Sequence, residues 1–200
     1  MKVESEEPVV RPWSVELVRV GAAAPATLRR LREDMVSILA HAVWVAERTM
    51  NPAPAFDPHR RQYNATTLLV MLNDLPVVPD VIRVGVTDVD LFLPVFTHVF
   101  GAAQLDGTAG IASCHRLRPE LTAEMQDAAL LRSRLLKEVL HELGHTLGLT
   151  HCRTSWCAMA ASRVAEEVDL KDPTFCDPCA ERVGVPPNGS RSFDLFREGE

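Results

Sequence analysis

The 200-residue sequence lacks the features of several classes of protein. No hydrophobic run reaches the roughly 18 residues of a membrane-spanning helix, and the opening MKVESEEPVVRP has no apolar segment of the kind that directs secretion. Basic residues are also few: 21 Lys and Arg against 27 Asp and Glu give a formal net charge of −6, whereas nucleic-acid binding needs a basic surface. We therefore expect a cytoplasmic protein that binds neither membranes nor nucleic acid. The sequence leaves the oligomeric state open.

A disulfide framework is also not expected, because the number of cysteines is odd and no export signal is present. The sequence contains five cysteines, Cys114, Cys152, Cys157, Cys176 and Cys179. Four of them lie between residues 152 and 179. In a reducing compartment, such clustering indicates metal binding or redox chemistry.

The hydrophobic pattern predicts an α/β fold. Short apolar stretches predict strands at 13–21, 67–72, 82–91, 96–104 and 110–117. Helical spacing of apolar residues predicts a helix over 25–48, opened by Pro25, and a longer one after Pro119 that runs to Leu147. We expect a mixed, twisted sheet, with the first helix as a right-handed crossover connection.

The chain is long enough for one substantial core, so we expect a single domain over residues 1–184. Its sheet and helices would occupy 12–149. Residues 150–184 are rich in cysteine, proline and polar side chains and show no obvious element. Residues 185–200 have the composition of a flexible tail.

The segment HELGHTLGLTH, residues 141–151, carries the strongest chemical signal. His141 and His145 are four residues apart, which places both on one face of a helix within reach of one zinc ion. Glu142 then lies beside the open coordination position, and Gly148 permits a sharp turn that returns His151 as third ligand. An amphipathic helix with incidental histidines is the alternative, but it does not explain the added glycine and third histidine. Three imidazoles and an open position form a catalytic zinc site.

This segment resembles the HExxHxxGxxH signature of the metzincin metallopeptidases. The pattern continues as Cys152, four residues, Cys157, one residue, Met159, and then CDPC at 176–179, which is similar to the archaemetzincin family. The resemblance implies a metzincin-like domain and a methionine turn at Met159 beneath the zinc. It also implies a substrate-binding edge strand, which maps onto residues 96–103 and includes Gly101 and Ala102.

The cysteines Cys152, Cys157, Cys176 and Cys179 predict a second zinc site. Four thiolates can close a tetrahedral structural site and order a segment that has little core of its own. A redox-active CxxC and unpaired thiols remain alternatives. Side chains of consecutive extended residues point to opposite sides, so His151 could face one zinc and Cys152 the other.

The resulting hypothesis is a peptidase with two zinc ions per chain that cleaves a peptide or protein substrate. Glu142 would act as general base toward a zinc-bound water. Tyr63, the only tyrosine, lies far upstream of Met159, so stabilisation of the oxyanion by a phenol is not expected. The alternative is a zinc-stabilised peptide-binding module with little or no turnover.

Overall fold

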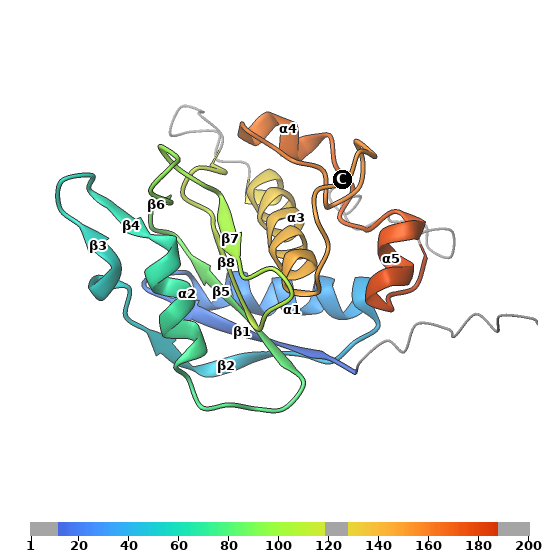
Figure 1. The fold of residues 1–200 in the computed structure, drawn as a ribbon, viewed down its shortest axis with the longest axis horizontal. Helices are drawn as coiled ribbons and strands as arrows, with labels where there is room; N and C mark the ends of the chain where they lie inside the picture. The colour runs from blue at the N-terminus through green and yellow to red at the C-terminus, as the bar shows by residue number, and fades with distance from the viewer. Residues whose placement is uncertain (1–11, 119–127, 188–200) are drawn as a thin grey trace, which may run out of the picture.

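A five-stranded sheet forms the centre of the computed structural model, which describes residues 12–118 and 128–187 (Figure 1). Its strand order is β2-β1-β5-β8-β7. The strands are β1 (Ser14–Val20), β2 (Val43–Met50), β5 (Val81–Thr87), β7 (Gly101–Ala103) and β8 (Ala109–Ser113). Neighbouring strands are parallel except β7, which pairs antiparallel with β8 and forms one edge of the sheet.

Helices cover both faces of this sheet. Successive strand residues point to opposite sides, and apolar side chains on both faces are buried against helices. The helices are α1 (Pro25–Leu39), α2 (Ala65–Asn73) and α3 (Ala128–Thr146). Leu17 and Ala112 belong to a core cluster shared with α1 and α3. Their neighbours Val18 and Ile111 belong to a second cluster, shared with α2. The domain therefore has three layers, with α3 crossing β8 and β7 on one face.

A small second sheet stands beside the main one. It consists of β3 (Phe56–Asp57), β4 (Gln62–Asn64) and β6 (Leu91–Phe92), and a 3₁₀ turn at Ala53–Ala55 precedes it. The Arg60 guanidinium lies 4.2 Å from the centre of the Phe92 ring and donates to the Phe96 carbonyl at 2.8 Å. Gln62 Nε2 donates to the Thr97 carbonyl at 2.9 Å. These contacts hold the segment that leads into β7.

The C-terminal segment packs onto the main core rather than forming a core of its own. It contains two short helices, α4 (Ala165–Asp169) and α5 (Asp177–Val183). Trp13 Nε1 donates to the Val183 carbonyl at 2.9 Å. The His41 ring stacks on Trp13 at 3.7 Å, and its Nε2 lies 3.2 Å from the Gly184 carbonyl oxygen. The beginning and the end of the described chain are thus joined.

The α/β class with a mixed sheet is confirmed, but two predicted elements are wrong. The helix predicted over 25–48 ends at Leu39, where Ala40 adopts a left-handed conformation with φ 56°, and 43–50 form β2. The stretch 67–72, predicted as a strand, lies in α2. The Asn64 side chain accepts from the amides of Thr66 and Thr67, which caps and starts that helix.

Other boundaries are shorter than predicted. The stretch 82–91 ends as a strand at Thr87, 96–104 is a strand only from Gly101 to Ala103, and 110–117 only as far as Ser113. Residues 119–127, where the last long helix was expected to begin, lie outside the described residues, as do 188–200 of the predicted tail. Val185, at the start of that tail, is buried in the core. No helix in the described ranges is long and apolar enough to cross a membrane.

Candidate active site

The three predicted histidine ligands converge at the C-terminal end of α3. His141 and His145 are one turn apart on the helix, and His151 follows after Gly148, whose φ of 84° turns the chain back. The ligand nitrogens of the three side chains lie within 4.8 Å of one another. The Nε2 atoms of His141 and His145 are 3.1 Å apart. This spacing suits ligands that share one ion.

Backbone carbonyls fix which ring nitrogens face the centre. His141 Nδ1 lies 2.8 Å from the Ala158 carbonyl oxygen, and His145 Nδ1 lies 2.8 Å from that of Leu149. A carbonyl only accepts, so Nδ1 carries the proton in both rings. Both Nε2 atoms are then left with lone pairs that point at each other, and a cation between them resolves the repulsion. The donor set therefore fits zinc.

Burial keeps these imidazoles neutral. It lowers the pKa of His141 to about 3, with the Lys171 ammonium adding to the effect. The pKa of His145 is lowered as well, again chiefly by burial. Neutral imidazole is the form that binds a metal, so both ligands are ready to bind across the neutral pH range.

The hairpin turn between β7 and β8 supports the end of α3. The amides of Asp106 and Gly107 donate to the carbonyls of His145 and Thr146, each at 3.0 Å. These carbonyls lie at the helix terminus, where intrahelical donors run out. The turn thus fixes the helix end that carries His145 relative to the edge strand.

Glu142 is buried on α3 and faces the same space as the histidines. Its pKa is raised well above the ordinary value by burial and by the nearby Glu138 carboxylate, while Lys171 opposes the rise. The side chain packs against Gly101, where a Cβ atom would lie 2.5 Å from Glu142 Oε1 and 2.6 Å from the Ile111 carbonyl oxygen. Glycine at position 101 therefore makes room for the Glu142 carboxylate.

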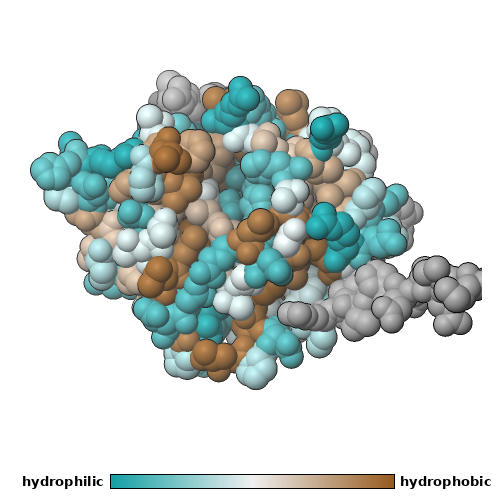
Figure 2. Space-filling model, viewed as in Figure 1, coloured by the Kyte–Doolittle hydropathy of each residue, from teal (hydrophilic) through white to brown (hydrophobic). Residues whose placement is uncertain are grey.

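These side chains line a cleft of about 760 Å³. On one side it is bounded by the segment before β7 and by β7 itself, and on the other by the chain after Met159. On the face of the molecule shown in Figure 2, hydrophobic and hydrophilic residues are interspersed. Residues lining the cleft include Leu93, Phe96, His98, Gly101, Ala102, Leu105, Glu138, His141, Glu142, His145, His151, Ser162 and Arg163.

Gly101 and Ala102 lie on β7, as the predicted edge strand requires. β7 pairs with β8 on one side only in the main sheet, and both residues also line the cleft. The strand is shorter than predicted, yet Gly101 packs against Glu142. Just before β7, Val99 bridges to Leu91 of the small sheet. An extended peptide in the cleft could pair with this edge.

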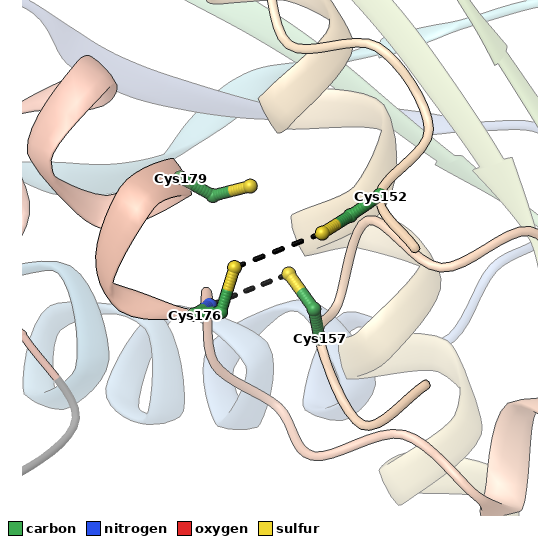
Figure 3. Close-up of side chains that lie close together, drawn as sticks. All are labelled: Cys152, Cys157, Cys176 and Cys179. Atoms are coloured by element: carbon green, nitrogen blue, oxygen red, sulfur yellow. Dashed lines mark hydrogen bonds between the residues drawn. The ribbon is translucent and has the colours of Figure 1, made fainter. Parts of the chain in front are cut away.

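The four clustered cysteines also come together (Figure 3). The sulfur atoms of Cys152, Cys157, Cys176 and Cys179 lie within 4.8 Å of one another. Cys152 Sγ is 3.7 Å from Cys176 Sγ, and the Cys176 amide donates to Cys157 Sγ at 3.3 Å. His151 and Cys152 are adjacent in sequence but belong to separate groups, as expected for side chains that point to opposite sides.

Without a counter-charge, the pKa values of Cys152, Cys157 and Cys179 are shifted in different directions. Burial raises the pKa of Cys157 to about 11, and that of Cys179 is also raised. For Cys152 burial acts in the same direction, but hydrogen bonds from Thr154 outweigh it and lower the pKa to about 7. A dication among the sulfurs would allow all four to be thiolates, so the group fits a structural zinc.

The CxxC at 176–179 opens helix α5, an element that the sequence pattern did not predict. Opening a helix is one feature of redox-active CxxC motifs. The motif follows a loop rather than a strand, however, and all five cysteines are free. Cys176 and Cys179 are both buried and lie within the group of four. This environment favours a structural metal site over exchange with external thiols.

Met159 is fully buried and packs against α3. A Cβ atom at Gly144 would overlap the Met159 sulfur and would lie 3.1 Å from Phe175 Cε1. Gly144 stands between the two helical histidines, so the methionine packs against the backbone that carries them. The placement agrees with the position expected for a methionine turn.

Two residues of the site were missed by the sequence reasoning. Glu138 lies on α3 one turn before Glu142 and lines the cleft. Lys171 follows α4 and donates to Glu138 Oε1 at 3.0 Å, with side-chain exposures of only 1% and 5%. The position of Glu138 on the same helix face as Leu131 and Leu135 was the available signal. The partner lies 33 positions away, which spacing within a motif does not reveal.

Comparison with known proteins gives consistent results. The model of Peptidase family M54 matches residues 43–184. Archaemetzincin from Methanocaldococcus jannaschii is 39% identical over 132 residues, which are 66% of this chain and 72% of that protein. Archaemetzincin from Archaeoglobus fulgidus is 35% identical over 157 residues, or 78% of this chain and 91% of the relative.

Solved structures share the fold as well. The crystal structure of archaemetzincin from Methanopyrus kandleri superposes with a TM-score of 0.73 at 32% identity, covering 86% of this chain and 94% of that one. A zinc-dependent peptidase from Methanocorpusculum labreanum gives a TM-score of 0.77 at 28% identity, covering 85% and 100%. The residues matched by the family model, 43–184, include the three histidines and the four clustered cysteines.

Proposed function

The chain belongs to the archaemetzincins, Peptidase family M54, and is a zinc metallopeptidase; from this premise we propose that Glu142 is its general base and that a second, structural zinc holds the C-terminal segment. The observation that carries the proposal is the convergence of three histidine nitrogens beside a buried carboxylate. His141, His145 and His151 would hold the catalytic zinc.

Zinc bound there supplies an electrophile that acidifies a water molecule and polarises the scissile carbonyl. With zinc held by the histidines, Glu142 would accept a proton from the attacking water and pass it to the leaving amine. In the metal-free fold, burial and the Glu138 carboxylate raise the pKa of Glu142. Gly101 leaves room for the carboxylate to reach the scissile bond from beneath the edge strand.

The substrate is a peptide or protein segment that lies extended along β7. Main-chain pairing at Gly101, on the side of β7 that faces away from β8, would orient it across the histidines. The absence of a side chain at Gly101 allows close approach of both the substrate backbone and Glu142.

The structural zinc would be held by Cys152, Cys157, Cys176 and Cys179. Two observations support this site. The four sulfur atoms lie within 4.8 Å of one another. Without a cation, the pKa of Cys152 is lowered while that of Cys157 is raised. This site would anchor the chain on both sides of Met159. It would also stabilise the position of Ala158, whose carbonyl orients His141.

Two measurements test the proposal. Protein purified without chelator should contain two zinc ions per chain, with X-ray absorption resolving one nitrogen-rich and one all-sulfur environment. A single zinc in fully loaded protein contradicts the two-site arrangement.

The zinc-loaded Glu142→Gln variant should retain its fold and both metals but lose peptide hydrolysis by at least about a hundredfold, because the amide cannot accept the proton. Cleavage at the wild-type rate would remove Glu142 from the mechanism.

A further inference from the structure

The segments on either side of β7 bring large apolar residues to the cleft. Leu93 and Phe96 precede the strand, and Leu105 follows it. Phe96 is 56% exposed and Leu105 is 58% exposed, and the surface inside the cleft is more apolar than polar. Leu93 and Phe96 are called the apolar wall below. Apolar residues that line a cleft and remain in contact with water indicate a ligand that covers them.

The backbone of the apolar wall is fixed, although Phe96 is exposed. The Phe96 amide donates to the Leu93 carbonyl at 2.9 Å, which closes a turn and brings the two residues together. Arg60 Nη2 donates to the Phe96 carbonyl at 2.8 Å and to the Thr97 carbonyl at 3.3 Å. Gln62 Nε2 donates to the Thr97 carbonyl at 2.9 Å. The small sheet therefore holds the turn that carries Phe96.

An ion pair outside the cleft holds these donors in turn. Gln62 Nε2 also donates to Asp90 Oδ2 at 3.0 Å, and Gln62 Oε1 accepts from Arg60 Nε at 3.2 Å. Arg116 donates to both carboxylate oxygens of Asp90, at 2.8 and 2.6 Å. Burial alone would raise the pKa of Asp90, but the hydrogen bonds from Arg116 and Gln62 outweigh it and lower the pKa. Four side chains thus form one connected series from Arg116 to the carbonyl of Phe96.

From this arrangement, we propose that the apolar wall is the subsite that selects a large apolar side chain of the substrate, such as phenylalanine or leucine. The proposal rests on the peptidase function proposed above. A large apolar side chain laid against Phe96 and Leu93 removes apolar surface of both partners from water. A charged side chain would give up hydration there without gaining a partner.

Asp90 and Arg116 are positioning residues for this subsite. Neither of the two lines the cleft, so they act through Gln62 and Arg60 on the backbone that carries Phe96. Removing Arg116 should therefore weaken the selection of apolar substrates without touching the substrate itself.

The place of the apolar wall along the chain predicts which part of the substrate it selects. Gly101, which packs against Glu142, is the first residue of β7, and the apolar wall precedes it. We expect a substrate extended along β7 to lay residues from one side of its scissile bond on this wall. Leu105 lies beyond the other end of β7 and would contact residues from the opposite side.

The test uses peptides that differ in a single residue. A peptide library and mass spectrometry first locate the bond that the wild-type, zinc-loaded enzyme cleaves. Peptides with Phe, Leu, Ala, Ser or Glu at each position near that bond are then compared by kcat/KM. Their affinity for zinc-loaded Glu142→Gln protein is measured by fluorescence anisotropy. At one position or more, we expect the Phe or Leu peptide to exceed the Ala peptide at least about tenfold in both measurements.

Variants of the wall assign this preference to Phe96. Phe96→Ser should reduce the preference for Phe over Ala at least about fivefold, and only on one side of the bond, whereas Phe96→Leu should retain most of it. Val95→Ser is the matched control, because Val95 is an 83% exposed apolar residue of the same turn that lies outside the cleft. It should leave the preference unchanged. Leu105→Ser should change the preference on the opposite side of the bond.

Variants of the ion pair test the positioning role. Arg116→Met should raise the KM of the Phe peptide at least about threefold, leave the kcat of the Ala peptide unchanged, and keep the zinc content. Arg116→Lys retains the charge but not the paired donors, so its effect should be smaller. Arg118→Met is the control, because the Arg118 guanidinium lies 3.9 Å from Cys114 Sγ rather than beside Asp90. A general loss of stability would instead reduce the turnover of both peptides alike.

The outcomes separate the inference from the proposed function. Cleavage with equal use of the Phe, Ala and Glu peptides overturns the apolar subsite but leaves the peptidase intact. A preference that survives Phe96→Ser, or is lost equally in Val95→Ser, overturns its assignment to the wall, and an unchanged KM in Arg116→Met overturns the positioning role. If no peptide is cleaved, the proposed function fails, and the binding series alone decides the subsite. Equal affinity for the Phe and Ala peptides then overturns it.

Discussion

The packing of Met159 against Gly144 makes a quantitative prediction. Alanine at position 144 would gain up to about 1 kcal/mol in helix propensity over glycine. Its Cβ, however, would overlap the Met159 sulfur and lie 3.1 Å from Phe175 Cε1 and 3.2 Å from Met159 Cε. Met159 and Phe175 are both buried, so neither can move into solvent. Overpacking of this kind costs about 1–3 kcal/mol, and the cost should exceed the gain.

We therefore expect Gly144→Ala to destabilise the protein by about 1–2 kcal/mol, which lowers the Tm of a chain of this length by about 2–8 °C. The effect should reverse when the overlapping atoms are removed. Met159→Ala alone creates a cavity and costs about 2–5 kcal/mol. Adding Gly144→Ala in that background should be neutral or mildly stabilising, because the new methyl group occupies part of the space that the methionine leaves.

Urea unfolding of the four proteins at a fixed zinc concentration, followed by tryptophan fluorescence, measures this double-mutant cycle. The coupling energy should be at least about 1 kcal/mol. Gly110→Ala is the control, because the atoms nearest to its new Cβ are 3.4 Å and 3.5 Å away. If Gly144→Ala stabilises the wild type as much as it stabilises Met159→Ala, the methionine does not pack beneath the helix as described.

Three further predictions concern the cleft and the ligands. Gly101→Ala should displace the Glu142 carboxylate, since its Cβ would lie 2.5 Å from Oε1, and lower kcat at least about tenfold while zinc content stays unchanged; unchanged kcat would refute the contact. Arg60→Met should raise the KM for peptides severalfold with less effect on kcat, because Arg60 holds the carbonyls of the cleft wall before β7; an unchanged KM would show that this wall needs no such support. His141 has a pKa of about 3 in the metal-free fold against an ordinary 6.5, so the unfolded chain binds the proton first. The stability of chelated protein is then greatest above pH 6.5 and falls as the pH drops toward 3. Urea midpoints between pH 7 and pH 4 measure this, and His141→Gln should flatten the profile.

The sequence predicted the parts of the site that are encoded locally. HELGHTLGLTH places its ligands by helix periodicity and one glycine turn, so His141, His145 and His151 meet as expected. The four cysteines were also recognisable from their spacing. Gly101 lies in an edge strand, although the strand is shorter than its apolar pattern indicated; its role in binding substrate stays a prediction.

The features that were missed depend on tertiary contacts or on patterns that fit two structures. The stretch TLLVML fits a buried strand and a buried helix equally well, and the Asn64 cap decides for the helix. Ala42 and Val45 fit helical spacing, yet 43–50 pair with β1 as a strand. Glu138 and Lys171 are ordinary surface residue types, and only the fold brings them together in a buried ion pair.

The closure of the C-terminal segment on Trp13 has a consequence for protein synthesis. A ribosome adds residues from the N-terminus, so the histidine motif emerges before the chain that supports it. The Ala158 carbonyl, which orients His141, and Lys171, which holds Glu138, come later, and the Val183 carbonyl that binds Trp13 comes later still. A nascent chain therefore carries the zinc motif without a finished cleft. Hydrolysis would begin only after α5 has left the exit tunnel.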